Sequence, residues 1–243
     1  MNSIARRALI TGASGGIGAA ICRQLARSGH QLYLHAFRGE RQAQALAREL
    51  NAANPCAEVL LFDVTDHLAT QAALERVLAT GPIQILVNNA GIHDDAVLPG
   101  MSALQWRRVI DVSVQGFFNV TQPLLLPMIR TRWGRIVNIS SIAALKGNRG
   151  QVNYAAAKGA LNSATRALAL EVATRGITVN AVAPGIIETP MTAQRFDAAA
   201  TSRLVPMQRA GSPAEVAELV GFLAGESASY ITGQVISING GMF

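Results

Sequence analysis

A chain of 243 residues in which 50% are hydrophobic, 15% are charged and 22 are glycine is too apolar to stay disordered, so we expect a folded enzyme with a sizeable core. The net charge of +6 favours anionic partners, but the arginines that carry it are scattered, which excludes the basic arm of a nucleic-acid-binding protein. No apolar run reaches the roughly 18 residues of a membrane span, and no signal peptide is recognisable at the start, so the sequence predicts a cytoplasmic protein without a membrane segment.

Short runs rich in valine, isoleucine and leucine alternate with segments of helical period along the whole chain. The expected strands are residues 8–11, 31–36, 59–62, 83–87, 135–140, 178–183 and 234–238, and the expected helices are residues 16–28, 41–53, 67–79, 103–132, 152–174 and 213–223. Apolar strands that alternate strictly with helices are typical of a parallel sheet covered on both faces. We therefore predict an α/β fold: a single Rossmann-type, doubly wound domain over residues 1–243 with a seven-stranded parallel sheet.

Residues 187–206 interrupt this alternation and contain Pro190 and Pro206. An irregular connection of this length inside a domain often covers a binding site, so we predict a substrate lid here. A plain surface loop is the alternative.

A glycine-rich loop, Gly12-Ala13-Ser14-Gly15-Gly16-Ile17-Gly18, follows the first expected strand and opens the first expected helix. Glycines allow a tight turn and let the backbone approach a pyrophosphate, and the helix N-terminus presents free N–H groups to it. The loop alone would be a weak signal, but its place between a strand and a helix predicts a dinucleotide site.

Arg38 follows the second expected strand, where an enzyme that uses NAD usually carries an acidic residue for the ribose 2′-hydroxyl. Because an arginine can bind a 2′-phosphate, this position favours NADPH over NADH, although an exposed loop arginine is the alternative. Asp63, after the third expected strand, could accept a hydrogen bond from the adenine amino group. It could equally cap a turn.

Tyr154 and Lys158 stand four residues apart on an expected helix, so their side chains share one face. An ammonium about 5 Å from a phenol lowers the pKa of the phenol by roughly two at an effective dielectric near 20, which makes the phenol a usable proton donor. Ser141 ends the preceding strand, where its hydroxyl could bind a carbonyl oxygen that gains negative charge. These three residues predict carbonyl reduction with a nicotinamide cofactor.

The chain at this point resembles the short-chain dehydrogenase/reductase family, and within it the 3-oxoacyl-(acyl-carrier-protein) reductases. The resemblance covers nearly the whole chain and implies NADPH-dependent reduction of a 3-oxoacyl thioester. It rests on the glycine-rich loop, Asp63-Val64, Asn88-Asn89-Ala90-Gly91, Ser141 with Tyr154-x-x-x-Lys158, residues 182–189 and the ending Ile238-Asn239-Gly240-Gly241-Met242-Phe243.

The resemblance also implies roles at the cofactor. Residues 88–91 would steady the central strand and contact the ribose, residues 184–189 would hold the nicotinamide, and Lys158 would bind the nicotinamide ribose as a second role. The expected cofactor residues are Gly12, Ser14, Gly15, Gly16, Ile17, Gly18, Arg38, Asp63, Val64, Asn89, Ala90, Gly91, Tyr154, Lys158, Pro184, Gly185, Ile187 and Thr189.

Two arginines, Arg132 and Arg175, occupy places where the similar carrier-protein reductases grip their acidic partner. Together with the positive net charge, they imply an acyl-carrier protein or another acyl thioester as the substrate, unless they are surface arginines without a partner. The resemblance further implies a homotetramer.

Ser113 departs from the family, whose members usually carry an asparagine there that helps to bind a water for proton relay to the lysine. Serine is shorter and lacks the paired donor and acceptor of an amide, so we expect Ser113 to take the catalytic position with reduced activity.

Two alternative functions remain open: reduction of a free ketone, sugar, steroid or quinone, and a non-catalytic cofactor-binding partner of an active homologue. Substrate choice would lie in the segments that line the pocket, and we expect contacts from Leu145, Gln151, Met191 and Phe196. The two cysteines and four histidines show no spacing of metal ligands, so no metal site is predicted.

Overall fold

The structure is a computed structural model, and it describes residues 5–189 and 198–243. Seven parallel strands form one sheet in the order β3-β2-β1-β4-β5-β6-β7. The strands are β1 (Arg7–Ile10), β2 (Gln31–Ala36), β3 (Ala57–Leu61), β4 (Ile85–Asn88), β5 (Gly134–Ile139), β6 (Ile177–Pro184) and β7 (Val235–Ile238). The predicted doubly wound fold is confirmed, and every strand boundary lies within two residues of its expected position.

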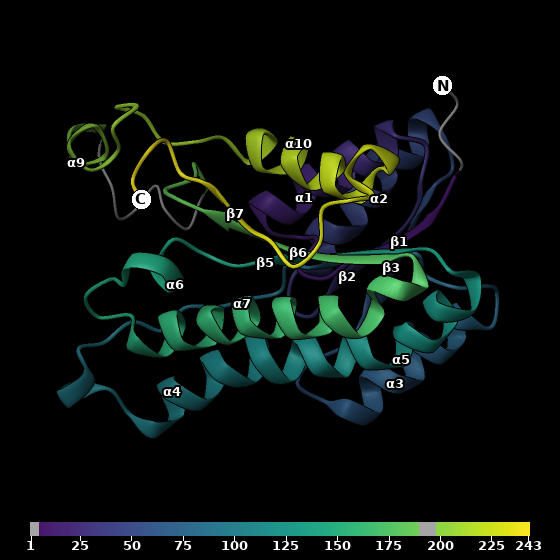
Figure 1. The fold of residues 1–243 in the computed structure, drawn as a ribbon, viewed down its shortest axis with the longest axis horizontal. Helices are drawn as coiled ribbons and strands as arrows, with labels where there is room; N and C mark the ends of the chain where they lie inside the picture. The colour runs from purple at the N-terminus through teal and green to yellow at the C-terminus, as the bar shows by residue number, and fades with distance from the viewer. Residues whose placement is uncertain (1–4, 190–197) are drawn as a thin grey trace.

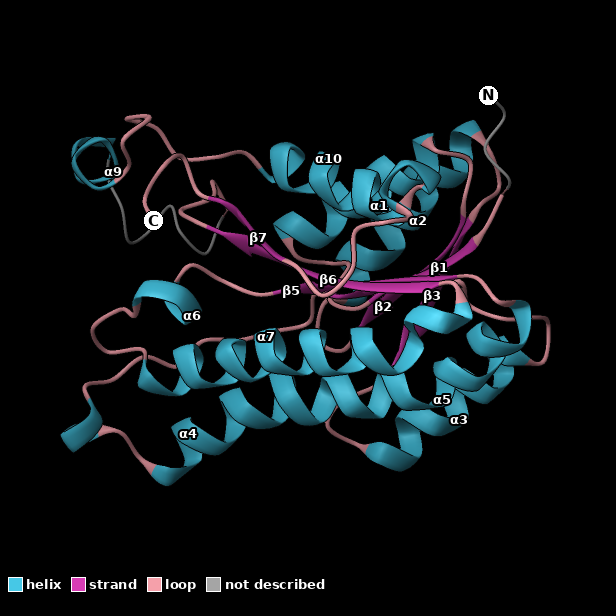
Figure 2. Cartoon of the chain, viewed as in Figure 1, coloured by secondary structure: helices cyan, strands magenta, loops and turns pink. Residues whose placement is uncertain are grey.

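Helices cover both faces of this sheet, as Figures 1 and 2 show. One layer holds α1 (Gly16–Arg27), α2 (Glu40–Ala53) and α10 (Pro213–Ala224), and the other holds α3 (His67–Leu78), α4 (Ala103–Ile110), α5 (Gly116–Thr131) and α7 (Val152–Val172). Short polar side chains cap three of these helices: Asp66 accepts from the Ala69 N–H, and Ser102 and Ser212 each form a capping box. The local sequence thus fixes where these helices begin.

The expected helix over residues 103–132 is interrupted, which corrects the prediction of one regular α-helix. A π-helical turn, Asp111–Gln115, separates α4 from α5, and α5 ends at Thr131 with Arg132 in a left-handed conformation at φ 51°. Gly116 follows the π turn, and a Cβ at this position would lie 2.9 Å from Cγ2 of Val64. The π turn and the glycine therefore let the helix pass close to the loop that follows β3.

The expected lid is only partly irregular. Helix α9 (Ala198–Leu204) occupies most of its second half, and residues 190–197 lie outside the described residues. A further short helix, α6 (Ala143–Lys146), follows β5 and was not expected.

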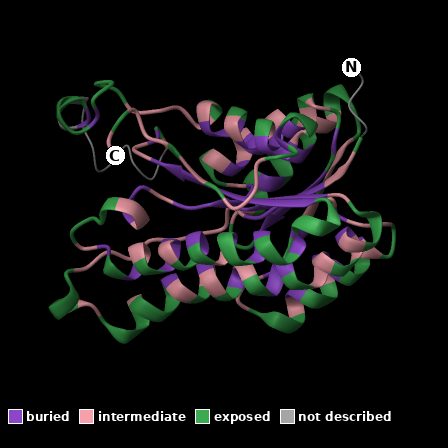
Figure 3. Ribbon diagram, in the orientation of Figure 1, coloured by how far each residue is buried: buried purple, intermediate pink, exposed green. Residues whose placement is uncertain are grey.

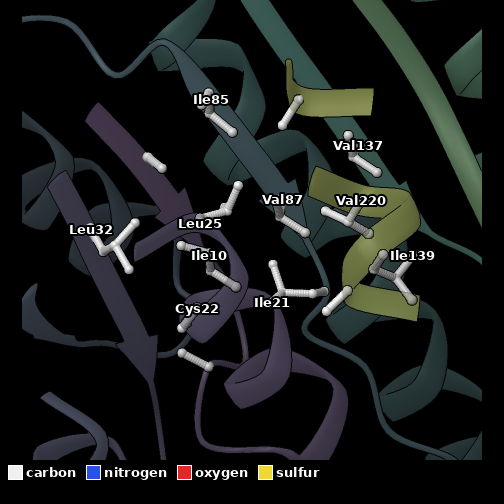
Figure 4. Packing of buried hydrophobic residues seen from close by; sticks show 14 of the residues in the cluster. Ile10, Ile21, Cys22, Leu25, Leu32, Ile85, Val87, Val137, Ile139 and Val220 are labelled. Carbon is white, nitrogen blue, oxygen red and sulfur yellow. The ribbon is translucent and has the colours of Figure 1, made fainter. Parts of the chain in front are cut away.

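The core consists of two apolar layers, one on each face of the sheet. Figure 3 shows the buried residues concentrated along the strands and the inner sides of the helices. Between the sheet and α1 and α10, side chains such as Ile10, Ile21 and Val220 are fully buried, and Figure 4 shows them packed together. Because both faces are covered, the rigid sheet holds its carboxyl-end loops in fixed positions.

Candidate active site

The carboxyl ends of the parallel strands gather most of the predicted site residues. The glycine-rich loop follows β1, residues 89–91 follow β4, Ser141 follows β5 and Gly185 follows β6. In an open α/β sheet this edge is where ligands bind, beside the point where the strand order reverses between β1 and β4.

The glycine-rich loop has the shape that a dinucleotide requires. Gly12 adopts φ +65°, a conformation that residues with a side chain rarely adopt, and a Cβ on Gly18 would lie 2.2 Å from the carbonyl oxygen of Gly12, so both positions favour glycine. The first turn of α1 has Gly15 as its N-cap and no side-chain cap. Its backbone N–H groups are therefore free to bind a pyrophosphate, and the chain fits the cofactor that the sequence implies.

The residues that follow β4 hold the glycine-rich loop in place through hydrogen bonds. The hydroxyl of Thr11 accepts the N–H groups of Asn89 and Ala90, each at 2.9 Å, and the amide of Asn89 donates to the carbonyls of Thr11 and Gly12 at 2.9 and 3.0 Å. Asn88 donates to Oδ1 of Asn138 on β5 at 2.9 Å, which agrees with the expected role in steadying the central strand. The side chain of Asn89 thus stabilises the glycine-rich loop.

The adenosine end of the expected site lies beside β2 and β3. Arg38 is exposed, with its guanidinium 5.4 Å from the centre of the Phe37 ring, and a Cβ on the next residue, Gly39, would touch Oγ of Ser14. Oδ1 of Asp63 accepts from the N–H and the hydroxyl of Thr65 at 2.9 and 2.8 Å. Asp63 therefore does cap a turn, and its contact with adenine stays a prediction.

Ser141 and Tyr154 meet in one pocket, which His93, Gln151, Gly185 and other residues also line. The Ser141 side chain lies close enough to the Tyr154 phenol to lower the pKa of the phenol as a hydrogen-bonding group. The same serine oxygen accepts the N–H of Ala143 at 3.1 Å. A hydroxyl beside a phenol at the carboxyl end of a sheet can bind and protonate a carbonyl oxygen.

Lys158 lies one turn after Tyr154 on α7 and is buried. Its Nζ is 5.8 Å from the centre of the Tyr154 ring and donates to the carbonyl of Ile139 at 2.8 Å. A Cβ on Gly91 would lie 3.1 Å from this Nζ, so a glycine at position 91 makes room for the ammonium. The lysine, the tyrosine and the loop after β4 therefore form one constellation.

The expected lowering of the Tyr154 pKa by the lysine is wrong for this structure. Burial raises the pKa of Tyr154, the hydrogen bond from Ser141 acts in the opposite direction, and the nearby charge of Asp95 adds to the rise. Burial also lowers the pKa of Lys158 to about 8. Desolvation thus outweighs the effect of the Ser141 hydrogen bond on the Tyr154 pKa, and the Lys158 ammonium is bonded to a backbone carbonyl rather than to the phenol.

Ser113 lies in the π turn, which packs against α7, and it is buried. Its hydroxyl has no hydrogen-bond partner within the part of the chain that the structure describes. An unpaired buried hydroxyl is uncommon and marks a position that a water or a ligand group could complete.

A family profile described as short chain dehydrogenase matches residues 6–200, which is most of the chain. The chain belongs to the short-chain dehydrogenase family. It is therefore an oxidoreductase that uses a nicotinamide cofactor, in agreement with the loop and the Ser141, Tyr154 and Lys158 constellation described above.

Curated relatives of this short-chain dehydrogenase match over nearly their full length. An acetoacetyl-CoA reductase of an Acinetobacter strain is 44% identical over 97% of both chains. A 3-oxoacyl-(acyl-carrier-protein) reductase of Aquifex aeolicus is 46% identical over 97% of this chain and 96% of its own length. The reductase of the same name from Escherichia coli is 42% identical over 100% of this chain and 99% of its own length.

Two polar networks of this short-chain dehydrogenase were not expected from the sequence. In the catalytic pocket, Gln151 donates to Oδ2 of Asp95 at 2.9 Å, and Nδ1 of His93 is 3.6 Å from Oδ1 of Asp95. At the cofactor loop, the imidazole of His35 is hydrogen-bonded on both sides. The sequence held only a weak signal for them: His35 lies in an apolar run, where a single histidine is more often a core residue, and His93 and Asp95 lie in the loop after an expected strand.

Not every predicted residue reaches the pocket. Gln151 lines it, Leu145 does not, and Met191 and Phe196 lie outside the described residues. Ile187 is buried after β6, and Thr189 is the last residue before the undescribed segment.

Arg132 and Arg175 lie together at the opposite edge of the sheet. Arg132 precedes β5 and donates to the carbonyl of Thr174 at 3.2 Å, while Arg175 precedes β6. Ser141 follows the other end of β5, so the length of a strand separates the arginines from the catalytic pocket. Both are exposed.

Across residues 5–189 and 198–243, no helix has both the length and the apolar character to cross a membrane. In the same ranges, no three His, Cys, Asp or Glu side chains are grouped so that they could hold a metal ion.

Proposed function

We propose that the chain reduces a 3-oxoacyl thioester to the 3-hydroxyacyl product with NADPH. The meeting of Ser141 and Tyr154 in one pocket, with Lys158 one helical turn away, carries this proposal. The relatives that act on acetoacetyl-CoA or on 3-oxoacyl-(acyl-carrier-protein) support the substrate class, because they match over nearly their full length.

Each catalytic residue has a separate task. A reduced nicotinamide, when bound, would supply the hydride for the carbonyl carbon. The hydroxyl of Ser141 donates a hydrogen bond to the carbonyl oxygen, and Tyr154 gives that oxygen its proton. Lys158 places a cation beside the phenolate that remains, in a buried setting where charge is poorly screened.

The proposal of NADPH over NADH rests on Arg38. The sequence His35-Ala36-Phe37-Arg38 after β2 holds no carboxylate that would repel a 2′-phosphate, and Arg38 is exposed beside the glycine-rich loop. A guanidinium binds phosphate through charge-assisted hydrogen bonds. The remaining cofactor contacts proposed for Pro184, Gly185, Ile187 and Thr189 would hold the nicotinamide end.

We further propose that the enzyme acts in the cytoplasm as a homotetramer and that an acyl-carrier protein delivers the substrate. Because Arg132 and Arg175 lie across the sheet from the pocket of the same chain, a carrier bound to them would reach the pocket of another subunit. This arrangement makes the carrier proposal depend on the oligomer.

The decisive experiment mixes the purified protein with NADPH and either acetoacetyl-CoA or an acetoacetyl carrier protein and follows the nicotinamide absorbance. Turnover with thioesters supports the proposal, turnover only with small free ketones supports a different reductase, and cofactor binding without turnover supports a non-catalytic partner.

Tyr154→Phe should lower kcat by roughly 100-fold or more, because it removes the proton donor. Tyr230→Phe, at a fully exposed tyrosine, is the matched control and should leave kcat unchanged. Equal turnover by Tyr154→Phe and the parent would refute the mechanism.

A further inference from the structure

His35 is a buried histidine near the end of β2, and its imidazole joins two segments of the chain. Nδ1 accepts the backbone N–H of Gly12 at 3.2 Å, and Nε2 lies 2.9 Å from the carbonyl oxygen of Phe62. The backbone carbonyl of His35 also accepts the N–H of Ala13 at 2.9 Å. The centre of the His35 ring lies 4.1 Å from the centre of the Phe62 ring. Two hydrogen bonds and one ring contact therefore fix the orientation of the imidazole.

These partners fix the protonation of the ring. A carbonyl oxygen only accepts, so Nε2 carries the hydrogen and Nδ1 presents its lone pair to the Gly12 N–H. Burial lowers the pKa of His35 to about 4, although the neighbouring Asp63 carboxylate acts in the opposite direction. The ring is therefore neutral at physiological pH, and its two nitrogens have distinct roles.

The two segments that His35 joins, together with its own strand, are those expected to form the phosphate and adenosine end of the cofactor site. Gly12 begins the glycine-rich loop, Phe62 directly precedes Asp63-Val64, and β2 leads into Arg38. Gly12 itself adopts φ +65°, and its N–H has the His35 nitrogen as its acceptor. The His35 side chain thus adds to the backbone bond between Ala13 and His35 a second link between the loop and β2, and it is hydrogen-bonded to the residue before Asp63 as well.

We propose that His35 is a positioning residue for the nicotinamide dinucleotide, which acts through its hydrogen bond to Gly12 to hold the glycine-rich loop in the conformation that binds the pyrophosphate. This role rests on the cofactor use proposed above and adds a residue outside the glycine motif. A buried N–H that loses its acceptor is costly, so the loop shifts to find a partner when the imidazole is removed.

Two polar variants separate the two bonds of the ring. In His35→Asn the amide oxygen replaces Nδ1 and keeps the bond to Gly12, whereas in His35→Gln the amide N–H replaces Nε2–H and keeps the bond to Phe62. We expect His35→Asn to bind NADPH with a Kd within about threefold of the parent value, and His35→Gln and His35→Phe to raise the Kd about tenfold. The Kd is measured by nucleotide fluorescence without any substrate, so the result does not depend on which carbonyl compound the enzyme reduces. If the parent protein binds NADH more tightly than NADPH, NADH is used as the probe.

His30 provides a matched control. Its Nδ1 accepts the N–H of Arg6 at 3.3 Å, and burial lowers its pKa too, but it lies at the opposite edge of the sheet. His30→Phe should lower Tm without changing the Kd. The proposal is overturned if His35→Asn and His35→Gln weaken binding equally, if His35→Gln binds as tightly as the parent, or if the Kd follows Tm across all variants including His30→Phe. Should His35→Phe fail to fold, the NADPH Kd values of His35→Asn and His35→Gln still test the proposal.

Discussion

Ser113 is a buried hydroxyl without a described partner, at a position where the resembling family carries an asparagine. An amide offers a donor and an acceptor together, so Ser113→Asn should hold a relay water better than serine does. We predict a several-fold rise in kcat, measured under saturating NADPH and thioester. An unchanged or lower kcat would defeat this explanation.

Ser113→Ala is the control for the hydroxyl itself. Removing an unpaired buried hydroxyl relieves its desolvation cost, so the variant should be as stable as the parent or more so. If kcat falls in Ser113→Ala while Tm holds, the hydroxyl takes part in the reaction.

Lys158 gives the stability of the protein a specific dependence on pH. Burial lowers its pKa in the folded chain to about 8, against an ordinary value of 10.5. Between these two values the unfolded chain binds more protons, so the contribution of this group to the free energy of unfolding rises with pH. Lys158→Met abolishes that contribution.

We therefore predict that the stability of the parent increases relative to Lys158→Met as the pH rises from 7.5 to about 10, with urea unfolding as the measurement. All other titrating groups are common to both proteins and cancel in the difference. A difference that stays constant over this range would mean that the ammonium is not buried when the protein is in solution.

The element that most constrains the site is the first turn of α1 with the loop before it. A Cβ on Gly18 would lie 2.2 Å from the Gly12 carbonyl oxygen, whereas a Cβ on Gly15 would have its nearest neighbour at 3.5 Å, an ordinary contact. Gly18→Ala should therefore destabilise the fold by about 2 kcal/mol, because the helix and the loop must separate. Gly15→Ala should cost much less. Thermal unfolding of the pair tests this, and equal Tm values would show that the loop tolerates a shifted helix.

The sequence predicted elements well where hydrophobic period and local signals agreed. All seven strands followed from their apolar runs, and the start of α10 followed from Ser212 and Pro213. The π turn over residues 111–115 has no such local signal, because it lies where the helix, at Gly116, passes close to Val64 in the loop after β3. Period alone predicted an unbroken helix there.

The same limit applies to the site. The spacing of Tyr154 and Lys158 was visible in the sequence because both lie on one helix. The raised pKa of Tyr154 was not, since it depends on burial and on the proximity of Asp95 from a distant segment. The bonds of His35 to Gly12 and Phe62 likewise join residues that come together only in the folded sheet.

At the scale of the whole molecule, the catalytic pocket and the two arginines proposed to bind a carrier lie on opposite edges of the sheet. The pocket with Ser141 and Tyr154 opens at the carboxyl edge, and Arg132 and Arg175 lie at the amino edge. A rigid sheet that is covered on both faces cannot bring these edges together by bending. Under the carrier proposal we therefore expect delivery from a neighbouring subunit, whereas a CoA thioester would not need one.

Carrier-linked and CoA-linked substrates should therefore respond differently to a change at Arg132. Arg132→Glu should raise the KM for a carrier-linked 3-oxoacyl substrate about tenfold, because it replaces attraction for an acidic partner by repulsion, and should leave the KM for acetoacetyl-CoA unchanged. Arg48→Glu, an exposed charge reversal on α2, is the matched control and should change neither value. Sedimentation of each variant shows whether the oligomer persists, since loss of assembly would also remove carrier delivery. An unchanged KM for the carrier-linked substrate in Arg132→Glu, with the oligomer intact, would mean that the carrier does not dock at this edge.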